Sequence, residues 1–334
     1  MQALQVYMGN ELPRINTHLD TCVQRLDPYV QPIARHVLDA GGKRLRPLLT
    51  LMAFRAFGAG QADPYSLAAS LELLHSATLL HDDILDSAGL RRGRPAAHTV
   101  FGRHATILGG DALLALGNRL VAEYGDSRLT VAISDGIMRT ATGEIREIAQ
   151  VGNMSLTNEE YLEIVTGKTA YLIEAATRCG AILGGADDAG VENASRFGLN
   201  LGIAFQLVDD ALDYGASEEE AGKSVAADLR EGKATLPLIL YMEGAEPEER
   251  QRLQELVRRI GVDADSPVAE VSGEDIAAVI ATVQRVREAG AAERTREMAA
   301  GYAQAARQSL DGFPTSQETD LLGEALEYVV QRNK

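Results

Sequence analysis

The stretch Leu80-His81-Asp82-Asp83-Ile84-Leu85-Asp86 decides how this 334-residue chain folds, and Leu207-Val208-Asp209-Asp210-Ala211-Leu212-Asp213 echoes it. Each copy is an apolar run that continues into three aspartates at the same spacing. On an α-helix with about 3.6 residues per turn, the first and last aspartates share one face and the second lies beside them. Three carboxylates this close repel one another unless a cation lies among them. The two stretches therefore predict two helices that each carry a cation site.

The cation that such clusters favour is a hard divalent ion with oxygen ligands. Mg²⁺ is the simplest choice, because it binds through a few carboxylates together with the phosphates of a substrate. Two clusters on two helices predict a cavity with metal-binding walls on opposite sides and a polyphosphate between them. The candidate ligands are the six aspartates of the two triples, namely Asp82, Asp83, Asp86, Asp209, Asp210 and Asp213.

The rest of the chain favours helices as well. Tryptophan is absent and aromatic residues make up 5% of the sequence, a composition that suits helices better than strands. No alternating strand pattern and no glycine-rich turn from strand to helix is visible. We expect one all-α domain over residues 1–334, with a polar loop or flap at 215–232, a variable surface segment at 263–273 and a lid-like last third. The expected long helices cover residues 3–26, 29–39, 45–57, 65–86, 106–124, 129–151, 158–183 and 191–214.

The net charge limits the kinds of binding partner, and the cysteine content indicates the cellular compartment. The formal net charge of −16 disfavours binding to nucleic acid and to anionic membrane surfaces. Cys22 and Cys179 are far apart and form no zinc-like cluster, which is typical of a reducing compartment. Residues 1–10 show no secretory signal, and no apolar stretch reaches the roughly 18 residues needed to span a bilayer. We therefore expect a cytoplasmic protein without a membrane span.

Three basic clusters offer counter-charges for a phosphate. Lys43 and Arg46 follow Gly41-Gly42 at an expected helix start, where backbone N–H groups and the helix dipole favour an anion. Arginine forks match phosphate oxygens. The other candidates lie near the first triple or directly after a glycine, and they are His75, Arg91, Arg92, Lys168 with Thr169, Lys223 and Lys233. Each motif taken alone also has a structural explanation, such as a solvated face, an ordinary loop or a core histidine.

Taken in order, these motifs resemble those of the trans-isoprenyl diphosphate synthases, also called polyprenyl synthetases. The similarity runs from residue 41 to residue 332. It rests on the glycine-lysine-arginine segment at 41–47, His75 with the run to Asp86, the segments 91–93, 167–169 and 205–206, and the segment 232–237. The resemblance implies an all-helical isoprenoid-synthase-type bundle around a deep central cavity, usually in a homodimer.

The resemblance also implies a role for each candidate residue. Asp82, Asp86 and Asp209 would hold about three Mg²⁺ ions on an allylic diphosphate, and Asp83, Asp210 and Asp213 would support them. The residues implied in contacts with the allylic diphosphate are Arg91, Lys168 and Lys233, and those implied in binding isopentenyl diphosphate are Lys43, Arg46, His75 and Arg92. Thr169 and Gln206 would line the region where positive charge develops. Lys223 would lie in a closing segment, although Ser224-Val225-Ala226-Ala227 departs from the proline and glycine common there in the family.

The implied reaction is ionisation of the allylic substrate, attack by the double bond of isopentenyl diphosphate, and loss of a proton. Product length is expected to depend on bulk one or two turns before the first aspartate, at Leu74, Ala77 and Thr78. Because Ala77 is small, we expect a long product of about octaprenyl class, with a short farnesyl or geranylgeranyl product as the alternative.

Three other classes of protein share part of these motifs. A class I terpene cyclase shares one aspartate helix but lacks the basic set for isopentenyl diphosphate. A non-catalytic synthase subunit tends to lose one triple, whereas both are intact here. A purely structural Mg²⁺- or Ca²⁺-binding helical protein leaves the basic clusters unexplained.

Overall fold

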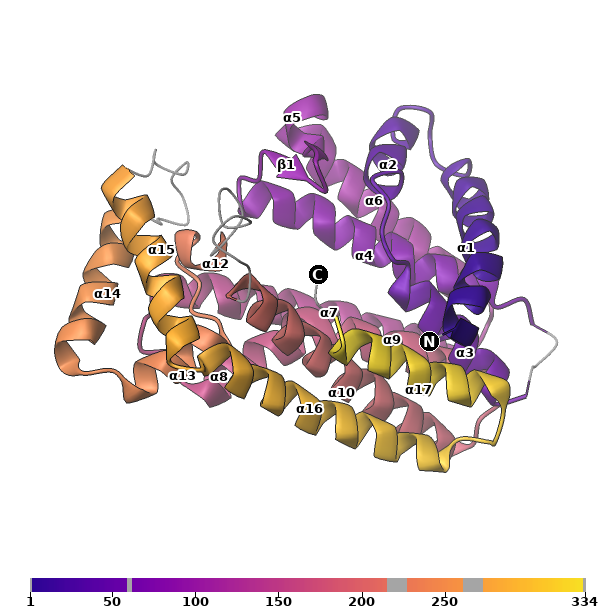
Figure 1. Ribbon diagram of the computed structural model, residues 1–334. Helices are drawn as coiled ribbons and strands as arrows, with labels where there is room; N and C mark the ends of the chain where they lie inside the picture. The colour runs from indigo at the N-terminus through magenta and orange to yellow at the C-terminus, as the bar shows by residue number, and fades with distance from the viewer. Residues whose placement is uncertain (1, 59–61, 215–226, 261–272, 333–334) are drawn as a thin grey trace. The chain divides into compact units, whose positions relative to one another are not determined.

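The computed structural model describes residues 2–58, 62–214, 227–260 and 273–332, and these residues are almost entirely α-helical (Figure 1). The expected all-α class is confirmed. In the described part, the only strands are β1 (Leu90–Arg91) and β2 (Arg94–Pro95), which form a short antiparallel ladder. This ladder lies in the stretch of basic residues that follows the first aspartate triple, and Gly93 turns between its strands with a φ of 76°.

The contacts of the chain group into two compact units, each assembled from several segments. The first unit comprises Met1–Met138, Tyr171–Leu199 and Ala306–Glu327, and the second comprises Arg139–Ala170, Asn200–Ala305 and Tyr328–Lys334. The unit boundaries fall within four helices, α7 (Ser127–Gln150), α10 (Asp188–Asp213), α16 (Ala291–Ser309) and α17 (Gln317–Val330), and after residue 170. The expectation of a single domain over residues 1–334 stays a prediction.

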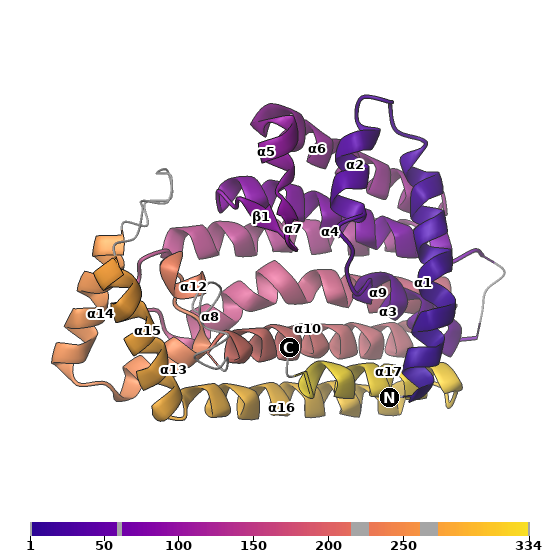
Figure 2. The same cartoon turned by 45° about the horizontal axis from the view of Figure 1, so that its top comes forward.

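Helix α4 (Tyr65–Leu85) is the central element of the first unit. It is apolar on nearly every side, and a helix of that kind is stable only when other elements surround it. It packs along α6 (Arg103–Ala122) and against α3 (Leu45–Ala56), α1 (Gln2–Val23) and α9 (Tyr171–Leu183) (Figure 2). Its core residues therefore fix the position of the first aspartate triple, which lies at the end of the helix.

A strained turn connects α2 (Gln31–Leu38) to α3. Gly41 and Gly42 have φ angles of 81° and 143°, which favour glycine, and Arg44 has a φ of 48°. The buried guanidinium of Arg44 donates to Glu72 of α4 at 2.6 Å and to the carbonyl oxygen of Leu38 at 2.6 Å. These contacts hold the unfavourable backbone of Arg44 in place. They also fix the loop that carries Lys43.

The expected helix over residues 158–183 is present, but it contains a π-helical turn. Its first part is α8 (Asn158–Val165), which starts with a capping box between Thr157 and Glu160. A π-helical turn, η1 (Thr166–Ala170), follows and separates α8 from α9. A Cβ on Gly167 would lie 2.6 Å from the Cα of Gly143, so α7 and this turn approach backbone to backbone. The chain is helical throughout residues 158–183, as expected, but the π turn within this stretch was not predicted from the sequence.

The second unit continues with α12 (Ala227–Arg230), α13 (Leu236–Gly244), α14 (Pro247–Ile260), α15 (Gly273–Glu288) and α16 (Ala291–Ser309). The final turn η2 (Leu310–Gly312) and most of α17 (Gln317–Val330) belong to the first unit, which also includes α5 (Ala97–Phe101). The end of the expected flap at 215–232 is thus a short helix. Lys223, residues 224–226 and almost all of the expected variable segment at 263–273 lie outside the described residues. No helix in the described ranges is long and apolar enough to cross a membrane.

Candidate active site

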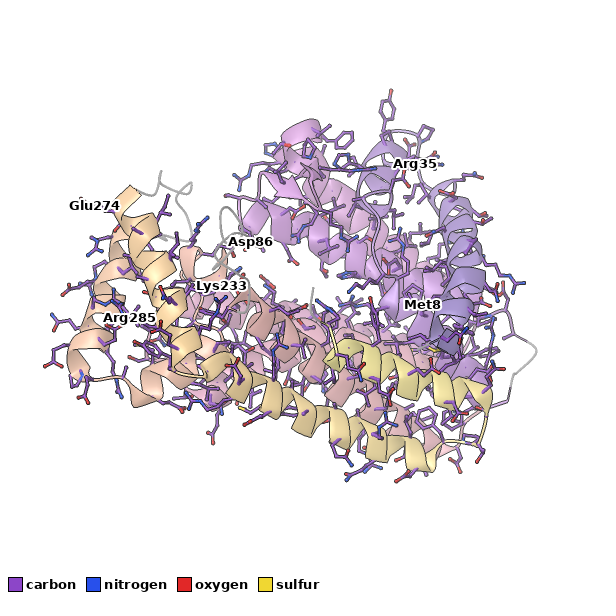
Figure 3. The ribbon with its side chains drawn as sticks, in the orientation of Figure 1. Met8, Arg35, Asp86, Lys233, Glu274 and Arg285 are labelled. Atoms are coloured by element: carbon purple, nitrogen blue, oxygen red, sulfur yellow. The ribbon has the colours of Figure 1, made fainter. Side chains whose placement is uncertain are left out.

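The first aspartate triple lies at the carboxyl end of α4. Asp82 and Asp86 are half-buried, and Figure 3 labels Asp86, which caps the helix. Asp83 is buried and accepts a hydrogen bond of 2.6 Å from Nε of Arg91. The triple therefore divides into two partly accessible carboxylates, one turn apart, and one that is held by an arginine.

This location fits a cation. The carboxyl end of a helix carries a partial negative charge, so aspartates there are unfavourable until a positive charge approaches. Asp82 and Asp86 offer oxygen ligands, which a hard divalent ion prefers. Among the described residues, no group of three or more histidine, cysteine, aspartate or glutamate side chains is close enough to hold a metal by itself. A metal at Asp82 and Asp86 would therefore need further oxygen ligands, such as those of a phosphate.

A basic cluster also belongs to the first unit. Lys43 is exposed, and Arg46 is half-buried at the start of α3. Burial, together with the nearby charge of Arg92, lowers the pKa of Arg46 to about 10, so its side chain stays charged at neutral pH. Burial and then Arg46 and Arg92 lower the pKa of His75 well below its ordinary value. His75 is therefore a neutral imidazole among arginines, and the cluster is suited to an anion.

Arg92 is held close to the glycines of the turn before α3. It has a φ of 52°, a strained backbone conformation for an arginine. A Cβ on Gly42 would lie 2.6 Å from Nη1 of Arg92, so only glycine leaves room for this guanidinium. His75 thus lies among Arg46, Arg91 and Arg92 in the first unit, and Lys43 follows the glycines that Arg92 approaches. Their role in binding an anion stays a prediction.

The second triple repeats the division seen in the first. Asp209 and Asp213 are half-buried at the carboxyl end of α10. Asp209 accepts a hydrogen bond from Nη2 of Arg332, whose guanidinium lies 4.8 Å from the ring centre of Phe205. Asp210 is buried and is held by donors of its own. In both triples the middle aspartate is the buried one, and it accepts hydrogen bonds from side chains.

A chain of hydrogen bonds runs through Asp210. The hydroxyl of Tyr161 donates to Oδ2 of Asp210, and Nε2 of Gln206 donates to Oδ1 at 2.8 Å. The hydroxyl of Thr169 donates to Oε1 of Gln206 at 2.9 Å. Burial raises the pKa of Asp210 to about 7 against the lowering effect of Tyr161 and Gln206. The predicted pair Thr169 and Gln206 is therefore linked directly to the predicted metal triple.

Lysines from two further elements gather at glutamates of α7. Lys168 in η1 contacts Glu144 at 3.1 Å and Glu147 at 2.5 Å. Lys233, between α12 and α13 and labelled in Figure 3, contacts Glu147 at 3.5 Å and Glu231 at 2.8 Å. The two lysines line a pocket of about 170 Å³ together with Tyr161, Thr169, Gln206 and Asp210. The second unit thus assembles the predicted lysines Lys168 and Lys233, the predicted Thr169–Gln206 pair and part of the triple.

Sequence reasoning missed several residues of this site. Asp228 lines the pocket, and burial followed by the charges of Asp210 and Asp213 raises the pKa of Asp228 well above its ordinary value. Tyr161, Glu147 and Arg332 were missed because a tyrosine or a single charged residue is common in any chain. A signal for Glu147 was available, because it lies one helical turn after Glu144 and makes a second acidic residue on the same face.

The residues expected to control product length lie within α4. Leu74 and Ala77 are fully buried, whereas Thr78 is half-buried and its hydroxyl donates to the carbonyl oxygen of His75 at 2.8 Å. Leu74 packs closely against Gly117 of α6, where a Cβ would lie 2.9 Å from it. Their role in product length stays a prediction, as does the prediction that the two triples share one cavity.

Comparison with known proteins identifies the family. The polyprenyl synthetase family matches residues 27–271 of the chain. A relative from Escherichia coli, named octaprenyl diphosphate synthase, is 36% identical over 230 residues, which is 69% of this chain and 71% of the relative. A relative from Methanothermobacter thermautotrophicus, named short chain isoprenyl diphosphate synthase, is 32% identical over 303 residues, which is 90% of this chain and 89% of the relative.

A solved structure extends the similarity to the whole chain. The polyprenyl synthase from Caulobacter crescentus, crystallised with calcium and isoprenyl diphosphate, is 36% identical. It covers 100% of this chain and 98% of its own, with a TM-score of 0.88. The resemblance in motifs is thus confirmed over the full length. The chain belongs to the polyprenyl synthetase family and is a prenyltransferase of the trans-polyprenyl diphosphate synthase type.

Proposed function

We propose that the enzyme joins isopentenyl diphosphate to an allylic diphosphate with the residues that the two units assemble, and that it depends on Mg²⁺. One observation carries this proposal. Each unit holds an aspartate triple in the same state, with two half-buried carboxylates at a helix end and a buried middle aspartate bonded to donors. Each unit also holds a cluster of cations. A diphosphate bound together with metal ions needs both kinds of group.

The donor set fits the proposed metal. Asp82 and Asp86 in one unit and Asp209 in the other would hold Mg²⁺, about three ions in all as the resemblance implies, with Asp213 in support. Their oxygen ligands and half-burial suit a hard ion that keeps part of its water and shares the oxygens of a phosphate. When bound, the metal would supply Lewis-acid stabilisation of the leaving diphosphate.

The residues of the second unit would bind the allylic diphosphate and stabilise the charge that develops when it leaves. Lys168 and Lys233 supply fixed cations at the pocket, and cations aimed at a developing negative charge lower the barrier. The oxygen atoms of Thr169 and Gln206 are held by their shared hydrogen bond, so their dipoles can stabilise a nearby carbocation without reorientation. The proton lost at the end of the reaction would pass to the released diphosphate.

The basic cluster of the first unit would bind isopentenyl diphosphate. Arg46 remains charged and His75 remains neutral at pH 7, so His75 can donate to a phosphate oxygen without adding to the repulsion among the arginines. Lys43 and Arg92 would complete this second anion site. Holding the nucleophilic double bond beside the ionising substrate would make the attack effectively intramolecular.

A direct assay tests the proposed reaction. The purified protein is incubated with Mg²⁺, labelled isopentenyl diphosphate and farnesyl diphosphate, and the products are separated by chromatography. We expect elongated prenyl diphosphates, no product after chelation by EDTA, and a loss of turnover of about 100-fold or more in Asp209→Ala. A terpene cyclase would instead convert the allylic diphosphate without isopentenyl diphosphate, and wild-type turnover in Asp209→Ala would contradict the metal site.

We further propose a long product, of about octaprenyl class. One of the two relatives described above is named for a long product and the other for a short product. We therefore infer the product length of this enzyme from the side chains of α4. Ala77 is small, and Ala77→Phe is expected to shorten the product while the first condensation continues. The lengths of labelled products measure this effect, and a thermal unfolding curve checks that the buried phenylalanine is tolerated. Unchanged product length in a folded variant would contradict the role of Ala77.

The proposed state of the protein is a cytoplasmic homodimer. Both cysteines, Cys22 and Cys179, are free and buried, in keeping with a reducing compartment. Several large apolar side chains of α6 and α7 are exposed in the single chain, among them Leu108, Val131 and Met138. Large exposed apolar side chains that gather into a patch mark a protein–protein interface.

A further inference from the structure

Glu147 lies between the two lysines of the pocket. The same oxygen, Oε2, is 2.5 Å from Nζ of Lys168 and 3.5 Å from Nζ of Lys233. The three side chains come from three different elements, namely α7, the π-helical turn η1 and the segment between α12 and α13. Their side chains are only 20%, 27% and 15% exposed, respectively. One carboxylate therefore joins three parts of the second unit at the wall of the pocket.

Two ammonium groups this close would repel each other strongly without a negative charge between them. Repulsion between like charges grows as the surroundings become less polar, and these side chains are largely removed from water. Burial by itself would lower the pKa of Lys168, but Glu147 and then Glu144 raise it above its ordinary value, so the ammonium stays charged. Glu147 thus permits both lysines to be charged side by side.

Glu144 provides an internal comparison on the same helix. It lies one turn before Glu147 and contacts Lys168 at 3.1 Å, whereas Glu147 contacts both Lys168 and Lys233. The two glutamates have the same charge and similar burial. Glu147 links η1 to the segment carrying Lys233 through its contacts with both lysines.

We propose that Glu147 is a positioning residue that holds Lys168 and Lys233 together as a paired cation site for the allylic diphosphate. This inference rests on the proposed function of the pocket. A lysine ammonium has three N–H donors, so a lysine that gives one donor to Glu147 can still offer another to a phosphate oxygen. Glu147 then acts through the lysines and does not touch the substrate.

The proposal predicts a change in anion affinity that is opposite in direction to the change expected from the charge of the pocket alone. Glu147→Gln removes a negative charge from the pocket, and charge alone would make an anion bind more tightly. If Glu147 positions the lysines, their mutual repulsion moves them apart in the variant and the anion binds more weakly. Glu147→Asp keeps the charge on a shorter side chain and should give an intermediate result.

The experiment is calorimetric titration of the full-length protein with inorganic pyrophosphate in the presence of Mg²⁺. We expect Kd to rise roughly 10-fold in Glu147→Gln, as for loss of a hydrogen bond to a charged group, with smaller rises in Glu147→Asp and Glu144→Gln. Glu163→Gln is the surface control, because Glu163 pairs with Arg146 at an exposed position, and its Kd should not change. Circular dichroism verifies that each variant is folded.

Steady-state kinetics provide the second measurement. KM for farnesyl diphosphate should rise in Glu147→Gln, while KM for isopentenyl diphosphate should not, because the residues proposed to bind it belong to the first unit. Pyrophosphate binding in Glu147→Gln that equals or exceeds wild-type binding would overturn the inference and leave the proposed function intact. Absence of pyrophosphate binding by the wild-type protein would overturn both.

Discussion

Tyr161 shows how a single hydroxyl can organise a charged site. It is 3% exposed, and it donates to the buried carboxylate of Asp210, which also accepts from Gln206. Both oxygens of Asp210 thus have a donor, so the carboxylate cannot rotate without losing a hydrogen bond. A buried acceptor that loses its donor carries the full cost of its desolvation. The orientation of Asp210, and through it that of Gln206 and Thr169, therefore depends on this tyrosine.

Tyr161→Phe is expected to lower the free energy of unfolding by about 1–3 kcal/mol. It is also expected to reduce kcat and to raise the Mg²⁺ concentration that gives a half-maximal rate. Urea unfolding and the Mg²⁺ dependence of turnover measure the two effects. Tyr124→Phe is the control, since the hydroxyl of Tyr124 accepts from the Leu67 amide and donates to the Asp63 carbonyl, both in the first unit. That control should lose stability without a change in Mg²⁺ dependence. An equal Mg²⁺ dependence in Tyr161→Phe and wild type would contradict the role given to Tyr161.

The spacing of the aspartates was predictable from the sequence, but their unequal states were not. The repeat of three aspartates at one spacing fixes which residues lie on one helix face. It cannot show that Asp83 meets Arg91, or that Asp210 meets Tyr161, which is 49 positions away in sequence. The middle aspartates are more deeply buried than the outer ones because of tertiary packing, about which a local pattern contains no information.

At the scale of elements, the π-helical turn η1 positions Lys168 and Thr169. A π turn widens the helix locally and is costly, so it persists where neighbours hold it, often at functional sites. Here glycines on both sides allow the backbone of neighbouring helices to come close. A Cβ on Gly143 of α7 would overlap the backbone nitrogen of Lys168, and a Cβ on Gly202 of α10 would lie 2.5 Å from the Cα of Ala170. The two glycines thus hold the turn between α7 and α10.

Gly143→Ala is expected to push η1 away from α7. Overpacking of this kind costs about 1–3 kcal/mol of stability, and displacement of Lys168 and Thr169 should reduce kcat/KM for the allylic substrate more than a loss of stability alone would. Thermal unfolding and steady-state kinetics at a temperature where the variant is folded separate the two effects. Gly301→Ala, at a helical position with no atom within 4 Å of the added Cβ, is the control. Normal kinetics in Gly143→Ala would show that the close approach is not needed for catalysis.

The sequence predicted most helices correctly, within a few residues at each end. The expected helix over 65–86 corresponds to Tyr65–Leu85, and that over 191–214 to Asp188–Asp213. The π-helical turn at 166–170 and the short helix Ala227–Arg230 were not predicted. Hydrophobic periodicity continues through the π turn with little change, and a helix of four residues is too short to show a period. These elements depend on packing against neighbours.

At the scale of the whole molecule, the two triples belong to different compact units, and each unit carries its own cations. The internal repeat of the sequence thus corresponds to a repeat of local chemistry. In each unit an acidic helix end contains a buried middle aspartate and has basic residues nearby. The net charge of −16 is no obstacle to anionic substrates, because cations gather at each candidate site. The net charge of the chain predicts which macromolecules it repels, whereas the local arrangement of cations determines which small anions it binds.

The proposed homodimer leads to a prediction about the exposed apolar residues of the first unit. Val131 and Met138 of α7 are 53% and 61% exposed, and their spacing of seven residues places them on one face of the helix. Contact with a second copy would remove this apolar face from water. The double variant Val131→Glu/Met138→Glu places two charges in the proposed interface, where burial without a partner is strongly unfavourable. We expect the wild-type protein to be a dimer and the variant to be largely a monomer.

Size-exclusion chromatography with light scattering measures the mass of each form at several concentrations. Val6→Glu is the control, because Val6 is also exposed, at 60%, but lies on α1, and it should leave the dimer unchanged. If the double variant and the wild type have the same mass, then the interface lies elsewhere or the protein acts as a monomer. If the variant is a folded monomer with reduced turnover, then dimer formation supports the active site, since neither Val131 nor Met138 lines the pocket that holds Lys168 and Lys233.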